Sequence, residues 1–307
     1  MKQNNLKGSI ILIIAALIWG LAFVAQSGAA SLVPPFIFNA LRSFIGASVL
    51  YLFCLVTNKN GKFRFFPEEK ADRKIFYIAA LVCGICLAVS INFQQFGIAV
   101  YPKGVASEAR AGFITALYVI LVPIFSIFMR KKVPVSVWIG VFVAILGIYL
   151  LCFSGGIGGI YLGDVLVFAC AICFSLHIMS VDKFVDKTGG IKLSIMQFTV
   201  AGVISLILSL IFELNAINLS NILSAAPQIL YLGIMSSGVA YTLQIVGQKY
   251  AEPSIASISM SLESVFAALG GWIISGNVLS GREFFGCTLV FAAIIVAQLP
   301  PIKIRNS

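Results

Sequence analysis

The sequence contains few charged residues and a single histidine. Only 10% of its 307 residues are Asp, Glu, Lys or Arg, whereas 60% are hydrophobic. A soluble domain of this size buries only about three quarters of its chain's surface, so it could not hide so much apolar surface from water. The composition therefore excludes a soluble globular protein and predicts an integral membrane protein.

Long polar connections are also absent. A helix of about 20 apolar residues crosses a hydrocarbon layer of roughly 30 Å, and ten such segments follow one another with short links. They lie near residues 9–28, 34–57, 75–98, 105–128, 135–153, 164–181, 191–212, 228–248, 254–275 and 283–299. The longest link, 58–74, is too short for a soluble domain. We expect an all-α membrane protein with ten transmembrane helices.

Motifs for catalysis and metal binding are missing. One histidine excludes a two-histidine metal site, and the sequence has neither a Gly-rich phosphate loop nor a nucleophile elbow. Two CxxC pairs, 83–86 and 170–173, resemble a zinc site, but both lie inside apolar segments without the loop that orients such ligands. We expect no enzyme activity, no cofactor and no metal.

Basic residues are distributed unevenly along the chain. If ten helices alternate in direction, every Lys and Arg except Arg42, Lys103, Arg110 and Arg282 falls on one side. The positive-inside rule places that side, with both termini, in the cytoplasm. The net charge of +10 therefore indicates a multi-pass protein of the cell membrane and not a nucleic-acid partner.

An internal repeat divides the chain. The stretch "GSIILIIAALIWGLAF" from Gly8 aligns with "GDVLVFACAICFSLHI" from Gly163, and "LYVILVPIF" from Leu117 aligns with "LESVFAALG" from Leu262. Each copy holds five helices, an odd number, so the second copy enters the membrane from the opposite side. Many secondary transporters are such inverted repeats, with the substrate site near the midplane. We predict two five-helix units, 1–154 and 155–307.

Three stretches carry a family resemblance. The sequences "ALIWGLAF" (16–23), "ASEARAGFITALYVILVPIF" (106–125) and the long segment from 232 to 293 resemble the EamA-type drug/metabolite transporters. The resemblance implies a ten-helix carrier that works by alternating access, with the fifth and tenth helices peripheral. It implies export of amino acids, other small metabolites or drugs, with proton exchange in some members.

The sequence departs from that family pattern in three places. Ser264 stands where a proline usually follows the glutamate, Phe174 and Ser175 replace a second Trp-Gly, and Asn277 replaces an acid. Without this proline, the sequence alone does not predict whether the helix is kinked at this point. The same holds for any proton coupling that depends on the kink.

Glu263 is the candidate for proton coupling. A charge at the bilayer centre costs roughly 3 kcal/mol, so such a residue normally faces a cavity or a partner. Because burial disfavours the charged form of a carboxyl group, Glu263 could exchange protons; the alternative is a structural hydrogen bond between helices. His177 is the second candidate, as a proton relay, although a lone histidine in a helix is more often a packing residue.

Polar and aromatic residues indicate a substrate pathway. The predicted lining residues are Trp19, Asn92, Gln95, Tyr118, Tyr241, Gln244 and Gln248. Tyr241, Gln244 and Gln248 share one helix face through their spacing, as do Asn92 and Gln95. Such groups suit a polar metabolite, but bonds between neighbouring helices are the alternative. Trp19 offers an aromatic wall for an organic cation or packs between helices.

Charged residues are expected at the outer mouth. Arg42 and Glu108 lie at similar depth in their helices, so we predict an ion pair between them; the alternative is that Arg42 anchors a substrate carboxylate. Arg110, nearer the interface, is expected to extend towards water.

The sequence therefore predicts a secondary transporter, and specifically an exporter, of small organic metabolites such as amino acids or drugs and amines. Its predicted partners are a small-molecule substrate, protons and the lipid bilayer. The alternative is a membrane-embedded sensor or helper subunit that binds a ligand without moving it. Substrate identity, direction, proton coupling and formation of a homodimer are left open by the sequence.

Overall fold

The computed structural model describes residues 5–57, 65–67, 69–102, 107–152, 160–275 and 280–299, and these contain helices but no strand. In chain order the elements are α1 (Asn5–Ala30), α2 (Pro35–Thr57), α3 (Lys70–Ala99), α4 (Ser107–Thr115), α5 (Tyr118–Phe128), α6 (Val135–Cys152), α7 (Leu162–Thr188), α8 (Gly190–Phe212), η1 (Leu214–Ala216), α9 (Leu219–Ser224), α10 (Ala226–Tyr231), the π-helix η2 (Leu232–Ala240), α11 (Tyr241–Tyr250), α12 (Pro253–Met260), α13 (Glu263–Ser275) and α14 (Gly281–Ala297).

In the part of the chain that the structure describes, seven helical segments are long and apolar enough to cross a membrane, judged by length and composition. Five are single helices, α1, α2, α3, α7 and α8; the others are Arg110–Phe128 and Ala226–Tyr250, each built from consecutive elements. Shorter apolar helices occupy Val135–Leu150 and Phe284–Ala297. The elements follow the predicted segments along the chain, and the architecture is that of a multi-pass membrane protein.

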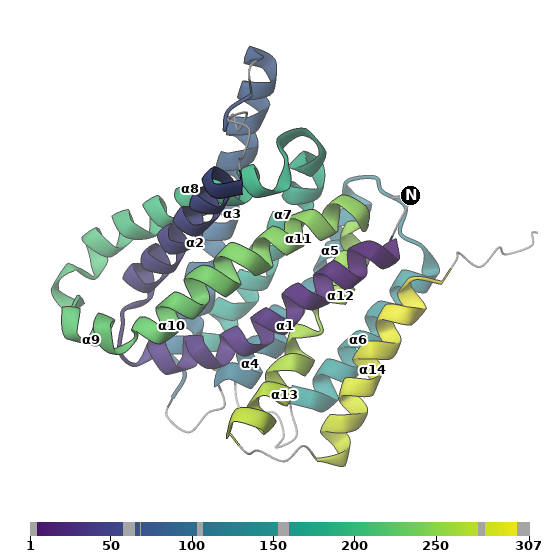
Figure 1. Cartoon of the computed structure of the whole chain (residues 1–307). Coiled ribbons are helices and arrows are strands. Elements are labelled where there is room, and N and C mark those ends of the chain that lie inside the picture. The colour runs from purple at the N-terminus through teal and green to yellow at the C-terminus, as the bar shows by residue number, and fades with distance from the viewer. Residues whose placement is uncertain are drawn as a thin grey trace, which may run out of the picture.

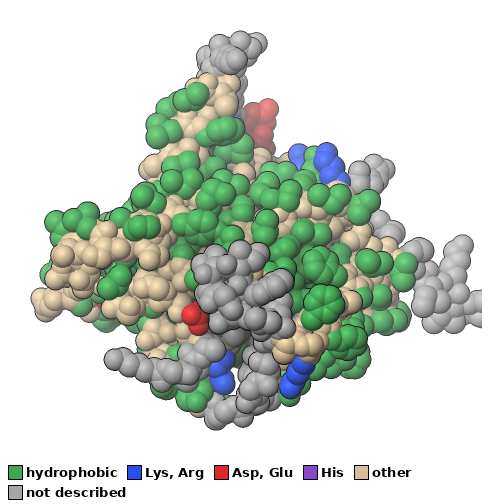
Figure 2. Space-filling view, turned by 60° about the horizontal axis from the view of Figure 1, so that its bottom comes forward, with side chains coloured by type: hydrophobic (Ala, Val, Ile, Leu, Met, Phe, Trp, Pro, Cys, Tyr) green, Lys and Arg blue, Asp and Glu red, His purple; other side chains and the backbone are tan. Residues whose placement is uncertain are grey.

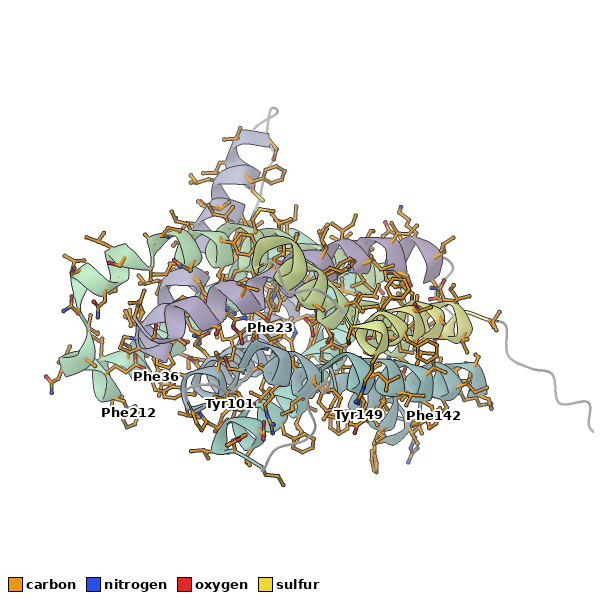
Figure 3. The ribbon with its side chains drawn as sticks, turned by 90° about the horizontal axis from the view of Figure 1, so that it is seen from below. Phe23, Phe36, Tyr101, Phe142, Tyr149 and Phe212 are labelled. Carbon is orange, nitrogen blue, oxygen red and sulfur yellow. The ribbon has the colours of Figure 1, made fainter. Side chains whose placement is uncertain are left out.

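Apolar side chains cover most of the molecular face shown in Figure 2. Phe128, Phe142 and Phe212 are among the large hydrophobic side chains that the fold leaves exposed. Phe142 and Phe212 point outwards at opposite ends of the molecule, whereas Phe23 lies in its interior (Figure 3). Lipid, not water, is the solvent that this surface fits.

Close helix crossings occur at glycines. On Gly8 of α1, a Cβ atom would lie 2.7 Å from the Cβ of Ala251, and on Gly163 of α7 it would lie 2.7 Å from the carbonyl oxygen of Gly97 in α3. Lipid tails are as apolar as the helices, so association in a membrane depends on such close van der Waals packing. These glycines hold α1 against the 241–253 region and α3 against α7.

Helices α6 and α14 lie side by side at one edge of the molecule (Figure 1). They meet at Gly147, whose added Cβ would be 2.7 Å from the carbonyl oxygen of Gly286. At the far end of α14, Gln298 donates a hydrogen bond to Ser9 near the start of α1, with a nitrogen–oxygen distance of 3.2 Å. The first and last helices therefore begin and end on the same side of the bundle.

Two helical segments, 107–128 and 253–275, are interrupted near their middle. The first breaks at 116–117, between α4 and α5, and the second at 261–262, between α12 and α13. At each break the backbone tightens: Val119 N–H donates to the Ala116 carbonyl at 3.0 Å, and Ser264 N–H donates to the Ser261 carbonyl at 3.2 Å. The interruption before Glu263 thus forms without the proline that the family pattern has at 264.

The glycine crossing between α1 and α13 provides a stability test. On Gly20 a Cβ would lie 2.6 Å from the Cβ of Phe266, whereas on Gly28, in the same helix, it would lie 3.8 Å from the side-chain nitrogen of Gln228. We expect Gly20→Ala to lower the free energy of unfolding by about 1–3 kcal/mol through overpacking. Gly28→Ala should leave it unchanged or slightly raised, because alanine favours a helix. Thermal melts of both detergent-solubilised variants measure this, and equal melting temperatures would contradict the crossing.

Candidate functional site

A cavity lies where the two interrupted segments meet. Its polar lining consists of Gln26, Arg42, Gln94, Thr115, Tyr118, Ser236, Tyr241, Gln244 and Glu263. Its apolar and aromatic lining consists of Trp19, Ala22, Phe23, Phe174, Ile178 and Met260. Helices before residue 153 and helices after residue 160 both contribute to the wall. An internal polar cavity within an apolar bundle is the expected form of a solute site.

An acid and a phenol join the two interruptions across the cavity. Tyr118 is the first residue of α5 and Glu263 is the first residue of α13. The Tyr118 hydroxyl donates a hydrogen bond to Glu263 Oε1 at 2.9 Å, and both side chains are buried. Glu263 therefore faces a cavity and a partner, as a carboxyl group in a membrane requires.

Arg42 projects from α2 into the same cavity. Its side chain is only 2% exposed. Nη1 donates to Gln26 Oε1 over 3.4 Å, a long bond, and Nε has no acceptor within the described residues. No described carboxylate forms an ion pair with this guanidinium. The wall thus holds a buried cation whose charge is not neutralised by a direct partner.

The predicted ion pair between Arg42 and Glu108 is wrong. Glu108 does not line the cavity and accepts a hydrogen bond from the Ser107 hydroxyl at 3.3 Å. Ser107 in turn contacts Ser27 near the end of α1, 3.2 Å away. The physical reason is rotational: Arg42 lies on the inward face of α2, while the first turn of α4 lies against the end of α1.

Aromatic rings form one wall of the cavity. Trp19 packs edge-on against Tyr241, with 4.8 Å between ring centroids, and Tyr241 also contacts Phe174 at 6.5 Å. The Trp19 indole nitrogen and the Gln244 side-chain oxygen are buried without a hydrogen-bond partner among the described residues. Buried polar atoms are normally satisfied, so these two atoms and Arg42 mark the wall as a place for a bound molecule.

Asn92 and Gln95 do not line this cavity, contrary to the predicted shared lining. The Asn92 amide donates to the Ser205 hydroxyl at 2.8 Å, which ties α3 to α8. The Gln95 amide donates to the backbone oxygen of Gln26 at 3.2 Å, which ties α3 to α1. Their geometry matches the alternative, in which amides bond neighbouring helices in lipid.

Gln248 and His177 also lie outside the cavity wall. Gln248 donates to the backbone oxygen of Ile178 at 2.9 Å, and His177 Nε2 lies 3.0 Å from Gln197 Oε1. The His177 side chain is fully buried. Both residues connect α7 to its neighbours, so the packing role that is usual for a lone histidine describes the geometry of His177.

An ion pair that the sequence did not predict connects α4 to α7. Arg110 Nη2 lies 2.6 Å from Asp164 Oδ2, and Arg110 Nε donates to Asp164 Oδ1 at 3.0 Å. The Tyr101 hydroxyl donates to the same carboxylate at 2.7 Å, and the Arg110 guanidinium lies over the Tyr161 ring. The expectation that Arg110 simply extends towards water is therefore wrong. The sequence contained one indication of this ion pair: Asp164 is an acid at the start of an apolar segment, where it needs a partner.

Phe174, Thr115 and Ser236 line the cavity but were absent from the predicted lining. The sequence repeat could have indicated Phe174. The offset of 155 residues that aligns Gly8 with Gly163 also aligns Trp19 with Phe174. The other two are small hydroxyl residues whose positions depend on neighbouring helices, and no periodic pattern in the sequence marks them.

Apolar spans around a buried polar cavity define a multi-pass membrane protein that accommodates a small solute. The model of the EamA-like transporter family matches residues 6–153 and again 161–298, and the chain belongs to this family. It is a membrane transporter, a class that is generally not enzymatic.

Two similar proteins bear the same general name. An "Uncharacterized transporter" of Archaeoglobus fulgidus is 30% identical, covering 96% of this chain and 87% of that protein. "Uncharacterized transporter YoaV" of Bacillus subtilis is 23% identical, covering 90% and 93%. A solved crystal structure has the same fold, with a TM-score of 0.75 at 21% identity over 95% of this chain and 96% of that one.

The ion pair between Arg110 and Asp164 is expected to stabilise the fold. Asp164→Asn should lower the free energy of unfolding by about 1–3 kcal/mol, because it leaves the largely buried guanidinium without a charged acceptor. Lys131→Gln is the comparison: the Lys131 side chain is 42% exposed, and glutamine can still donate a hydrogen bond to Asp182, whose side chain is 7% exposed. This change should therefore cost less than Asp164→Asn. Thermal melts compare the two variants. A larger loss for Lys131→Gln would contradict this assignment.

Proposed function

We propose that this transporter is a secondary carrier that moves small organic solutes by alternating access, with its substrate site at the Tyr118–Glu263 cavity. The observation that carries the proposal is the meeting of two interrupted helices at one buried polar cavity. Discontinuous helices at the membrane midplane form the substrate sites of many secondary transporters, because the break frees polar groups that an intact helix would occupy.

The proposed architecture is an inverted repeat of two five-helix units, 1–154 and 155–307, with ten membrane-crossing segments. Equivalent positions of the sequence repeat line the same cavity: Trp19 with Phe174, and Tyr118 with Glu263, which share a hydrogen bond. The same equivalence holds for packing, since Gly8 crosses next to the carbonyl oxygen of Gly247 and Gly163 next to that of Gly97. Two successive matches to one family model support this division.

Alternating access requires that the cavity open to one side at a time. Only about 40 Å³ of the cavity is open to the centre of a water molecule, room for a few waters, so an organic solute needs a wider conformation. Helix α7 is held at both ends: Asp164 pairs with Arg110, and Asp182 pairs with Lys131. The two aspartates are about five helical turns apart and share one face. Release of one pair or the other would open one end of the cavity.

The orientation that we propose places both termini in the cytoplasm of a cell-membrane protein. The uneven distribution of Lys and Arg supports it through the positive-inside rule, and the contact between Gln298 and Ser9 supports termini on one side. Export is the proposed direction. Solute and proton would alternately occupy the cavity, each shifting the equilibrium between its two open states by differential affinity.

Glu263 is the proposed coupling acid. The groups around it in the cavity are the Tyr118 hydroxyl, which bonds to it, the Tyr241 hydroxyl and the Arg42 guanidinium. Tyr118 links this acid to the opposite interrupted helix, so a proton gained or lost at Glu263 acts on the contact between the two halves.

Flux into proteoliposomes tests both the carrier and the coupling. The panel comprises labelled amino acids, amines, quaternary ammonium compounds and nucleosides, each measured with and without a pH gradient. We expect saturable flux of one class, accelerated by the gradient. In Glu263→Gln, flux at saturating solute should persist while the acceleration disappears, because glutamine cannot exchange a proton.

The control is Glu108→Gln, which removes a carboxylate outside the cavity and should retain the acceleration. Full gradient dependence in Glu263→Gln would refute the coupling role. Ligand binding without flux of any compound would instead favour a sensor or helper subunit.

A further inference from the structure

We infer that the first turns of α3 bind an anionic phospholipid, with its phosphate against Lys70, Arg73 and Lys74 and its acyl chains along the apolar residues that follow on the same helix. A surface hollow lies at this place, and about 350 Å³ of it is open to the centre of a water molecule. The hollow is lined by Lys70, Arg73, Lys74, Tyr77 and Ile78, and it shares no residue with the proposed solute cavity.

The basic residues of this end share one face of α3. Successive residues of a helix are turned by 100°, so positions 70, 73, 74 and 77 fall within an arc of roughly 100°. Residues 69–74 are all exposed, and this end of α3 projects from the bundle (Figure 1). The neighbouring acids, Glu69 at the N-cap and Asp72 in the first turn, do not line the hollow.

The two lysines of this face are not neutralised by the protein. Among the described residues, no carboxylate forms an ion pair with Lys70 or Lys74. Asp72 lies roughly 200° around the helix from Lys70, on the opposite side. The positive charge of the face is therefore directed towards an anion outside the protein.

Aromatic rings mark the lower edge of the basic face. Arg73 is held there by its Nε and Nη2 atoms, which donate to the carbonyl oxygen of Pro67 at 3.2 and 3.1 Å. Next to this proline, the exposed ring of Phe66 lies 5.7 Å from the exposed ring of Tyr77, measured between centroids. Aromatic side chains are enriched at the headgroup level of a membrane. Phe66 and Tyr77 therefore indicate where the interface crosses α3.

The length of α3 agrees with this depth. From Ile78 to its end at Ala99, the helix rises about 32 Å at 1.5 Å per residue, which matches the hydrocarbon layer of roughly 30 Å. Positions 70–74 then lie roughly 6–12 Å beyond that layer. Long basic side chains reach back over such a distance to the lipid phosphates.

Below the hollow, the same side of α3 is apolar and exposed. Leu81, Val82 and Ile85 continue along it, at the level of the acyl chains. A phospholipid matches the basic turn, the aromatic edge and the aliphatic stripe in the order in which they follow one another. Phosphatidylcholine carries its own cation beside the phosphate, whereas phosphatidylglycerol is a net anion. The unpaired lysines therefore favour phosphatidylglycerol.

Native mass spectrometry of the purified full chain measures the affinity for the first lipid bound. Phosphatidylglycerol and phosphatidylcholine with identical acyl chains are the two probes. Each Lys or Arg close to an anionic membrane surface contributes roughly a fivefold factor in binding. We expect phosphatidylglycerol to bind at least about 20-fold more tightly than phosphatidylcholine.

Two double variants locate the site. Lys70→Gln with Lys74→Gln should reduce this preference to about fivefold or less, because only Arg73 remains on the face. The matched control is Lys183→Gln with Lys187→Gln, which removes the same charge from exposed positions of α7 and should retain the preference. Melting temperatures in neutral detergent report whether each variant is folded. If the first double variant does not fold, Lys74→Gln alone should lose about fivefold.

Three outcomes would overturn the inference. The first is equal affinity of the wild-type chain for both lipids, and the second is an unchanged preference in the Lys70 and Lys74 variants. The third is an equal loss in the α7 control, which would show a response to net charge alone. A final probe, sn-glycerol 3-phosphate, carries the phosphate without acyl chains and should not displace bound phosphatidylglycerol at 100-fold excess, on the order of the gain from burying acyl chains. Displacement would assign the hollow to a soluble anion and not to a lipid.

Discussion

Hydrocarbon offers no hydrogen-bond partner, and this constraint decides where the polar side chains of the membrane-crossing helices lie. Most of them find partners between helices, as Asn92 does with Ser205 and Gln248 does with a backbone carbonyl. The groups that stay without a partner are therefore informative. Arg42 and Trp19 belong to this set, and both face one cavity. Other buried polar atoms without a partner among the described residues, such as His177 Nδ1 and Gln197 Nε2, lie outside the cavity. An incompletely met requirement therefore supports the cavity as a site only together with its shape and lining.

The bundle contains two kinds of region: helix pairs that are closely packed at glycines, and helix interruptions. Glycine crossings such as Gly97 with Gly163 bring backbones together and leave no room for a Cβ atom, so these helix pairs are expected to move as units. The interruptions at 116–117 and 261–262 have fewer regular backbone bonds. Packed interfaces are not continuously deformable. We therefore expect the conformational change of a carrier to be concentrated at these interruptions, beside the cavity.

In the repeat that we propose, the two halves differ in chemistry at equivalent positions. Tyr118 and Glu263 occupy matching places in the repeat, yet one is a phenol and the other an acid. Trp19 and Phe174 match in the same way, but only Trp19 carries an N–H group. Under the proposed repeat, sequence divergence between the copies thus places different polar groups at matching positions of the cavity wall.

The sequence by itself determined that the protein lies in a membrane and predicted that Glu263 faces a cavity or a partner, because hydropathy and burial cost are local properties. Of the predicted pathway residues, Trp19, Tyr118, Tyr241 and Gln244 line the cavity, whereas Asn92, Gln95 and Gln248 bond neighbouring helices. Only the tertiary structure decided the partners. Each residue advances 100° around a helix, so small errors in rotation exchange neighbours. Arg42 therefore faces the cavity without Glu108, and Arg110 finds Asp164, a residue remote in sequence whose carboxylate only helix packing brings within reach.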